Sequence, residues 1–154
     1  MAESVSAVER IEIERACERL VHAYSRALDL GDLSGAADLF AENGSMRRPM
    51  TPDQLIEGRE RIRVALLTRP KTLLTRHLAT NVMIEVDSPD AAHGISCLTM
   101  IATTPRAAEQ PPFLSSGPIY FGEFKDRFVR ERGEWRFLER FGSIQMKFPG
   151  AAPS

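Results

Sequence analysis

Cysteine is scarce in this chain of 154 residues, which contains only Cys17 and Cys97. The two lie far apart and form no Cys-x-x-Cys pair, which argues against a disulfide framework and against a structural zinc site. We therefore expect both thiols to lie in the core. Glu18 and His22 are one helical turn apart, but a catalytic zinc site needs a third protein ligand. We expect no metal and no organic cofactor.

An excess of charge of one sign is also lacking, as are long apolar runs. Twenty basic and 21 acidic residues give a formal net charge of -1, and no basic block is present that could neutralise nucleic-acid phosphates. No stretch approaches the roughly 20 apolar residues of a membrane span. The amino terminus, MAESVSAVERIEIER, is not a secretory signal. We expect a cytoplasmic protein that binds neither nucleic acid nor membrane.

The nucleotide-binding and serine-hydrolase patterns GxGxxG, phosphate loop and GxSxG are missing as well. What is present is an ordinary globular composition, with 43% hydrophobic and 27% charged residues. The length suits one domain, so we expect a single domain over residues 1–154, with a frayed tail at about 149–154.

Helices are predicted in the first half of the chain. Apolar residues recur every three or four positions over residues 7–30, which indicates one amphipathic helix. Its expected buried stripe is Val8, Ile11, Cys17, Leu20, Tyr24 and Leu28. Gly31 suits a left-handed helix end and Asp32 suits an N-cap, so a second helix is expected over residues 33–40. The segment AENGS that follows should end it. A third is expected from about Pro52 or Gly58 to Leu67.

Strands are predicted in the second half. Residues 73–87 alternate with period two, 92–104 form an apolar strand, and 120–148 form a hairpin that turns at Arg132-Gly133. The proline-rich segment 104–118 is expected to be a long irregular connection that forms a rim or a lid. Helices followed by an antiparallel meander predict the α+β class.

Several of these segments together resemble the SnoaL-like branch of the nuclear-transport-factor-2 (NTF2)-like superfamily. They are YSRALDLGDLSGAADLF, GRERIR, TRHLATNVMIEVD and ERGEWRFLERF. The resemblance covers nearly the whole chain and implies an NTF2-like cone, in which a curved antiparallel or mixed sheet packs against N-terminal helices around an apolar pocket. The family includes scytalone dehydratase, hexachlorocyclohexane dehydrochlorinase and bile-acid 7α-dehydratase, whose Asp and His form a catalytic dyad.

By this resemblance, Asp29 and His77 fall on the dyad positions and Tyr24 on that of a pocket tyrosine. A neutral imidazole is a suitable base for a carbon-bound proton, and a carboxylate beside it fixes its tautomer. Asn81 is expected as a further pocket donor. The resulting hypothesis is a dehydratase-like lyase or isomerase acting on a small apolar, aromatic or polycyclic substrate.

The alternation of residues 73–87 raises a difficulty, because His77 and Asn81 share the face opposite Val82 and Ile84. If only the smoother apolar face were buried, His77 would meet solvent. The functional interpretation therefore needs both faces of the sheet covered, one by the helices and the other by a partner. We accordingly expect a homo-oligomer, a dimer or a trimer.

Other interpretations stay open. Asp29 could simply belong to the turn before Gly31, Tyr24 could be a core residue, and His77 could be an ordinary strand histidine. The chain could be a non-catalytic ligand-binding or assembly module, as ring-hydroxylating dioxygenase small subunits share the fold. It could also resemble limonene-type epoxide hydrolases, which need an Asp-Arg-Asp arrangement. Five arginines could attract an anionic substrate, but the acidic residues among them make surface solubility the better account: Arg47, Arg48, Arg59, Arg61 and Arg63.

Overall fold

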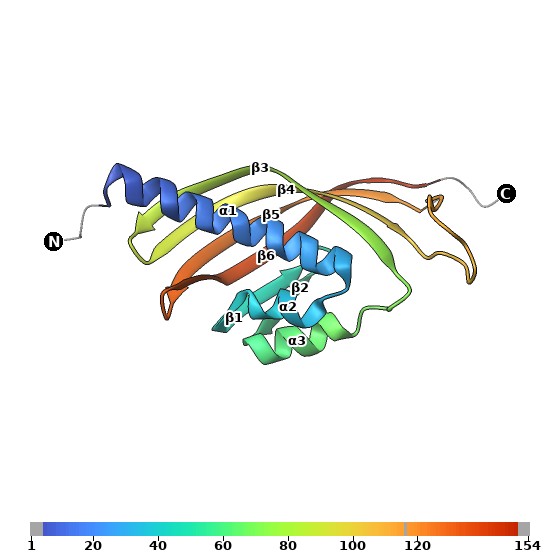
Figure 1. The fold of residues 1–154 in the computed structure, drawn as a ribbon, viewed down its shortest axis with the longest axis horizontal. Coiled ribbons are helices and arrows are strands. Elements are labelled where there is room, and N and C mark those ends of the chain that lie inside the picture. Colours follow the sequence, from blue (N-terminus) through green and yellow to red (C-terminus); the bar gives the residue numbers. More distant parts are fainter. Residues whose placement is uncertain (1–4, 116, 151–154) are drawn as a thin grey trace.

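The computed structural model describes residues 5–115 and 117–150, and within these ranges the helices precede most of the sheet (Figure 1). The helices are α1 (Ala7–Leu30), α2 (Leu33–Asp38) and α3 (Arg59–Leu67). The strands are β1 (Phe40–Arg48), β2 (Thr51–Glu57), β3 (Leu74–Ser88), β4 (Ala91–Thr103), β5 (Ile119–Glu131) and β6 (Glu134–Phe148). This arrangement confirms the predicted α+β class.

The first two helices begin and end at the predicted signals. Gly31 takes the left-handed conformation at the end of α1, with φ of 75°, and the Asp32 side chain accepts a hydrogen bond of 2.9 Å from the backbone N–H of Gly35. The predicted apolar stripe is wrong at its start, where Val8 and Ile11 are exposed. At about 100° per residue they lie roughly opposite the buried stripe. That stripe consists of Ile13, Cys17, Leu20, Val21, Tyr24 and Leu28.

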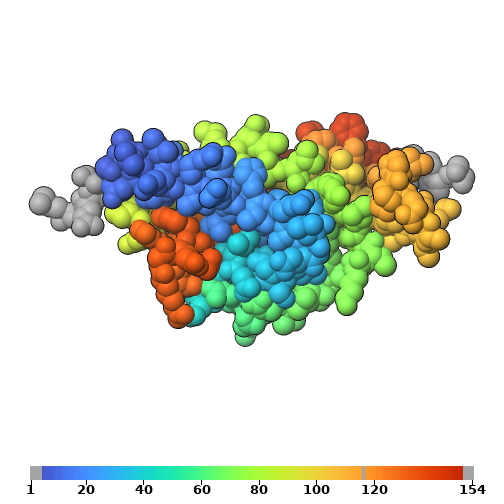
Figure 2. Space-filling model, viewed as in Figure 1, coloured from blue at the N-terminus to red at the C-terminus, as the bar shows by residue number. Residues whose placement is uncertain are grey.

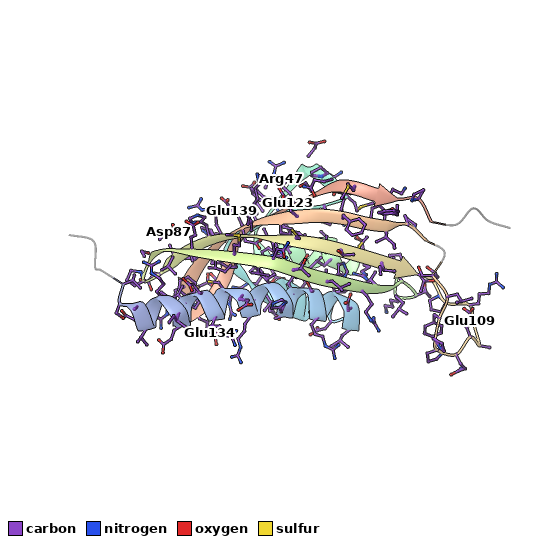
Figure 3. The ribbon with its side chains drawn as sticks, turned by 90° about the horizontal axis from the view of Figure 1, so that it is seen from above. Arg47, Asp87, Glu109, Glu123, Glu134 and Glu139 are labelled. Carbon is purple, nitrogen blue, oxygen red and sulfur yellow. The ribbon has the colours of Figure 1, made fainter. Side chains whose placement is uncertain are left out.

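The sheet is mixed, with the strand order β2-β1-β6-β5-β4-β3. Strand β1 pairs with β6 in parallel, and all other neighbours are antiparallel. The sheet curves, and α1 crosses its concave side (Figures 1 and 3), packing mainly against β3. The space-filling view shows all three helices gathered on this side, with the connection between β4 and β5 at one end (Figure 2).

Strands β1 and β2 were not expected from the sequence. The second helix ends at Asp38 rather than residue 40, and the segment AENGS lies inside β1. The third helix begins after Gly58, so the start at Pro52 was wrong. Polar residues dominate these strands, and their order comes from pairing with each other and with the distant β6. Local propensity carries little of that information.

A β-bulge in β3 changes which face its residues occupy. The register with β4 shifts between Thr80 and Met83, and Asn81 has φ of 49°. The extra residue inverts the alternation, so that His77 and Val82 are both on the partly buried side while Leu78 and Met83 are exposed. The prediction that His77 lies opposite Val82 was therefore wrong, because simple alternation does not anticipate a bulge.

The other local predictions have mixed outcomes. Arg132 and Gly133 both have positive φ, as a tight hairpin turn requires. Cys17 is buried, but Cys97 is exposed because β4 turns Ser96 and Leu98 inward instead. Residues 151–154 of the predicted frayed tail lie outside the described residues. Among the described helices, none is both long enough and apolar enough to span a membrane.

A buried ion pair lies between β5 and β6. Arg140 is 0% exposed, and its guanidinium donates to Asp126 Oδ2 across 2.5 Å. The guanidinium carbon also lies 3.8 Å from the ring centre of Phe124 and 4.7 Å from those of Tyr24 and Phe137. Burial raises the pKa of Asp126 to about 6, although Arg140 opposes the shift. Desolvation thus outweighs the attraction between the two charges.

Replacing Arg140 by methionine should destabilise the fold by about 3–5 kcal/mol near neutral pH, because a buried carboxylate loses its partner. The cost should shrink as the pH falls toward about 6, the pKa of Asp126 in the native fold. In both proteins the pKa of Asp126 in the folded state exceeds that in the unfolded chain, so its protonation favours folding. The gain is larger in the variant, where Arg140 no longer lowers that pKa.

Urea unfolding at several pH values measures both effects. Arg127→Met is the matched control, because Arg127 forms an exposed pair with Glu139 and such pairs contribute little. Equal costs for the two variants, or a cost for Arg140→Met that grows on acidification, would contradict this account.

Candidate active site

Three hydrogen bonds hold the Asp29 carboxylate, in the last turn of α1, against the first residues of β3. Its Oδ2 accepts from the backbone N–H of His77 at 2.9 Å. Its Oδ1 accepts from the Thr75 hydroxyl at 2.9 Å and lies 2.6 Å from His77 Nδ1. The side chains of His77 and Asp29 are only 8% and 11% exposed. The two predicted dyad residues are therefore in direct contact and shielded from solvent.

The contact also determines which imidazole nitrogen is available as a base. A carboxylate only accepts hydrogen bonds, so Nδ1 of His77 must carry the hydrogen that faces Asp29. In the neutral ring, Nε2 then has the free lone pair. Because Asp29 also binds the backbone of His77, it orients the whole residue as well as its ring.

His77 lines a cavity of about 440 Å³. The cavity lies between the helices and the sheet, and Asp29 is not among its lining residues, so His77 separates the carboxylate from the cavity. Most of the wall is apolar, contributed by Leu28, Leu66, Leu98, Met100, Phe124 and Ile144. An apolar cavity with a few polar side chains is typical of a small-molecule site.

The surroundings of His77 favour its neutral form. Burial lowers the pKa of the imidazole, whereas the hydrogen bond and the charge of Asp29 raise it. The positive charges of Arg69 and Arg140 lower it further. Since the resulting pKa is below the ordinary histidine value, His77 is uncharged at neutral pH and its Nε2 can accept a proton.

Tyr24 lines the same cavity. Its hydroxyl points at Met46 Sδ, 3.6 Å away, which is a weak acceptor. Burial is the largest influence on its pKa and raises it, so Tyr24 keeps its proton at neutral pH. The phenol is thus a donor whose present partner a substrate oxygen could replace.

Asn81 does not meet the other predicted residues. It occupies the bulge of β3 with an exposed side chain, and its amide lies 3.8 Å from the thiol of Cys97. It is not among the residues that line the cavity. We therefore leave Asn81 out of the proposed site.

A family model for the SnoaL-like domain matches residues 9–140. The chain belongs to the SnoaL-like domain family. A proposed scytalone dehydratase from Novosphingobium aromaticivorans has a similar structure, with a TM-score of 0.74 and 25% identity, covering 94% of this chain and 91% of its own. A comparison with curated protein sequences gives no match.

Two other solved structures also share the fold of this SnoaL-like protein. A protein of unknown function from Mycobacterium tuberculosis has a TM-score of 0.68 and 28% identity, over 88% of this chain and 77% of its own. A type 2 hexachlorocyclohexane dehydrochlorinase has a TM-score of 0.77, over 96% and 95% of the two chains. Its identity is 16%, so it supports the fold alone. The predicted SnoaL-like resemblance and NTF2-like fold are confirmed.

Some residues of the SnoaL-like site were missed by sequence reasoning. Thr75 could have been found, because it lies two positions before His77 and so shares its face. Arg69 donates to the Thr75 hydroxyl and lines the cavity, but the sequence analysis gave it no role. Arg48 and Thr51 also line the cavity, and assigning Arg48 to surface solubility was wrong. Their position depends on the unpredicted strands β1 and β2.

The buried Asp126–Arg140 pair supplies part of the arrangement that an epoxide hydrolase of the limonene type needs. Neither residue lines the cavity. Among the described residues, Asp126 alone forms an ion pair with Arg140. The second acid of an Asp-Arg-Asp arrangement is therefore missing there. The structure therefore gives this alternative little support.

Nuclear magnetic resonance titration can test the electrostatics of the dyad without a substrate. The imidazole of His77 should titrate below the ordinary histidine pKa of about 6.5. Asp29→Asn should lower that pKa further, because the hydrogen bond and charge of Asp29 raise it in the native protein. His93, an exposed histidine that pairs with Asp87, is the internal control. An upward shift of His77 in the variant would show that the described contact is absent in solution.

Proposed function

We propose that this SnoaL-like protein is a cofactor-independent lyase or isomerase that abstracts a carbon-bound proton from a small apolar substrate. The observation that carries the proposal is the contact of 2.6 Å between His77 and Asp29 at the wall of an apolar cavity. His77 is the base, through Nε2. Asp29 orients the imidazole and stabilises the imidazolium that forms.

The electron pair of the broken C–H bond determines the product. In an elimination, that pair becomes a new C=C bond while a C–O or C–halogen bond on the adjacent carbon breaks. When hydroxide departs, the imidazolium returns its proton to it and water leaves; when halide departs, it leaves as the anion and the imidazolium releases its proton to solvent. In an isomerisation, no group leaves, and the same proton is delivered to another carbon of the delocalised anion. Both routes use the same dyad.

Tyr24 has a supporting role in this proposal. Its protonated phenol can donate to a carbonyl oxygen of the substrate, where negative charge develops as the proton is removed. The apolar wall suits an aromatic or polycyclic carbon skeleton and excludes water from the reacting atoms. The name of the proposed scytalone dehydratase from Novosphingobium fits this class of reaction.

Proton abstraction can be tested on a panel of aromatic ketones and β-hydroxy ketones in deuterated water. The native protein should accelerate either deuterium incorporation or loss of water for some members, detected by nuclear magnetic resonance. His77→Gln should reduce the rate by about 10²–10⁴-fold, the usual contribution of a general base. Asp29→Asn should also reduce it. His93→Gln, an exposed histidine outside the cavity, is the matched control.

The same experiment separates catalysis from ligand binding. If the panel compounds bind and His77→Gln has no effect on exchange or elimination, the dyad is not a catalyst. The chain would then be a non-catalytic pocket or assembly module. Co-purification with a large iron-bearing partner would point to a module similar to the dioxygenase small subunits.

We also propose a homo-oligomer, a dimer or a trimer, together with a cytoplasmic location. The bulge in β3 removes the original reason for a partner, because His77 faces the helices. Support comes instead from exposed apolar side chains on the outer face of the sheet: Leu78, Met83, Ile95, Met146 and Phe148. Charged residues also occupy this face, including the labelled Asp87, Glu123 and Glu139 (Figure 3).

Light scattering after size-exclusion chromatography measures the oligomeric state. Ile95→Glu should shift the native oligomer toward monomer, because a charge would be buried where Ile95 now meets a second copy. Val64→Glu is the matched control on α3, where Val64 is also exposed. A native protein that is monomeric at micromolar concentration would disprove the oligomer.

A further inference from the structure

The cavity has a second polar region besides the dyad. Arg48, the last residue of β1, and Thr51, the first residue of β2, both line it. Strands β1 and β2 are at one edge of the sheet, and β3, which carries His77, is at the other. The cavity therefore has polar side chains toward both edges of the sheet and an apolar wall between them.

Two buried polar atoms in this second region have no hydrogen-bond partner. They are Nε of Arg48 and Oγ1 of Thr51, which find no partner in the part of the chain that the structure describes. A buried polar group without a partner is unfavourable, and such groups in native structures call for an explanation. The accessible surface of each atom is below 1 Å², so a ligand in the cavity would reach them after a small rotation of the two side chains, both of which line it.

The charge in this region is also unbalanced. Arg48 and Arg69 line the cavity, and none of its described lining residues is acidic. Arg69 donates to Thr75 and lies close enough to Asp29 for that carboxylate to raise its pKa against the larger effect of burial. Within residues 5–115 and 117–150, Arg48 forms no ion pair, whereas Arg59 and Arg63 do. The excess positive charge therefore belongs to Arg48.

The neighbouring Arg47 shows that this placement is specific to one residue. It points to the face of the sheet away from α1 (Figure 3), where its guanidinium lies 5.3 Å from the ring centre of Phe141 and donates to the carbonyl of Pro52. Arg48 has neither partner and lines the cavity instead. One of two adjacent arginines thus serves the turn between β1 and β2, and the other is left for the cavity.

We propose that the substrate carries a carboxylate, and that Arg48 and Thr51 bind it at the end of the cavity remote from His77. The proposal rests on the proposed function, whose substrate class it narrows to apolar acids. A carboxylate has two acceptor oxygens, which match the guanidinium and hydroxyl donors. The carbon skeleton lies along Leu98, Met100 and Phe124 and presents its acidic C–H bond to His77.

Naphthoate and naphthamide are suitable probes, because they have nearly the same shape and differ in charge. Isothermal titration calorimetry of the native protein should show naphthoate binding about tenfold or more tightly than naphthamide. Arg48→Gln should remove most of that preference and weaken naphthamide binding far less than naphthoate binding. Thr51→Val should also reduce the preference for naphthoate over naphthamide. Arg61→Gln, an exposed arginine on α3 outside the cavity, should change neither affinity.

Binding of naphthamide by Arg48→Gln shows that the variant is folded, so loss of naphthoate binding cannot be ascribed to unfolding. Equal affinities of the native protein for the two probes, or a preference that survives Arg48→Gln, would overturn the proposal. His77→Gln should keep the preference for naphthoate. The two proposals can therefore be disproved separately. Calorimetry tests the carboxylate site, and proton exchange tests the catalytic dyad.

Discussion

The hydrogen bonds that Asp29 accepts from β3 are the constraint on which the rest of the site depends. An acid in the last turn of a helix faces the negative end of the helix dipole, which is unfavourable for a carboxylate. Three donors from Thr75 and His77 compensate for this. The same bonds fix the end of α1 on the sheet and hold the imidazole at the cavity wall. A locally unfavourable position thus becomes the point where helix and strand are joined.

The protonation state of His77 follows from a balance between its burial and the charge of Asp29. Burial alone would make the imidazole a poor proton acceptor, and full exposure would let water compete for its nitrogen. Asp29 offsets part of the effect of burial on the pKa without entering the cavity. The cavity therefore presents a neutral ring, and the negative charge of Asp29 lies behind it.

Much of the fold could be predicted because local patterns determine it. Helical periodicity located α1, Gly58 was among the expected starts of α3, and the positive-φ turn at Arg132-Gly133 set the hairpin. Strands β1 and β2 were not predicted, because their polar residues form strands by pairing with distant segments. Resemblance to a family, rather than any local pattern, identified Asp29 and His77. The inward placement of Arg48 could not be predicted, because it follows from those two unpredicted strands.

The bulge at Asn81 divides β3 into two parts with independent alternation. Before it, even-numbered side chains face outward; after it, they face the helices. The part of the strand that lines the cavity and the part that packs in the core therefore alternate independently of each other. Divergence at the far end, toward Ser88, can adjust how the strand packs on α1 while the geometry around the imidazole is preserved. One additional backbone unit thus lets the two halves of the strand pack separately.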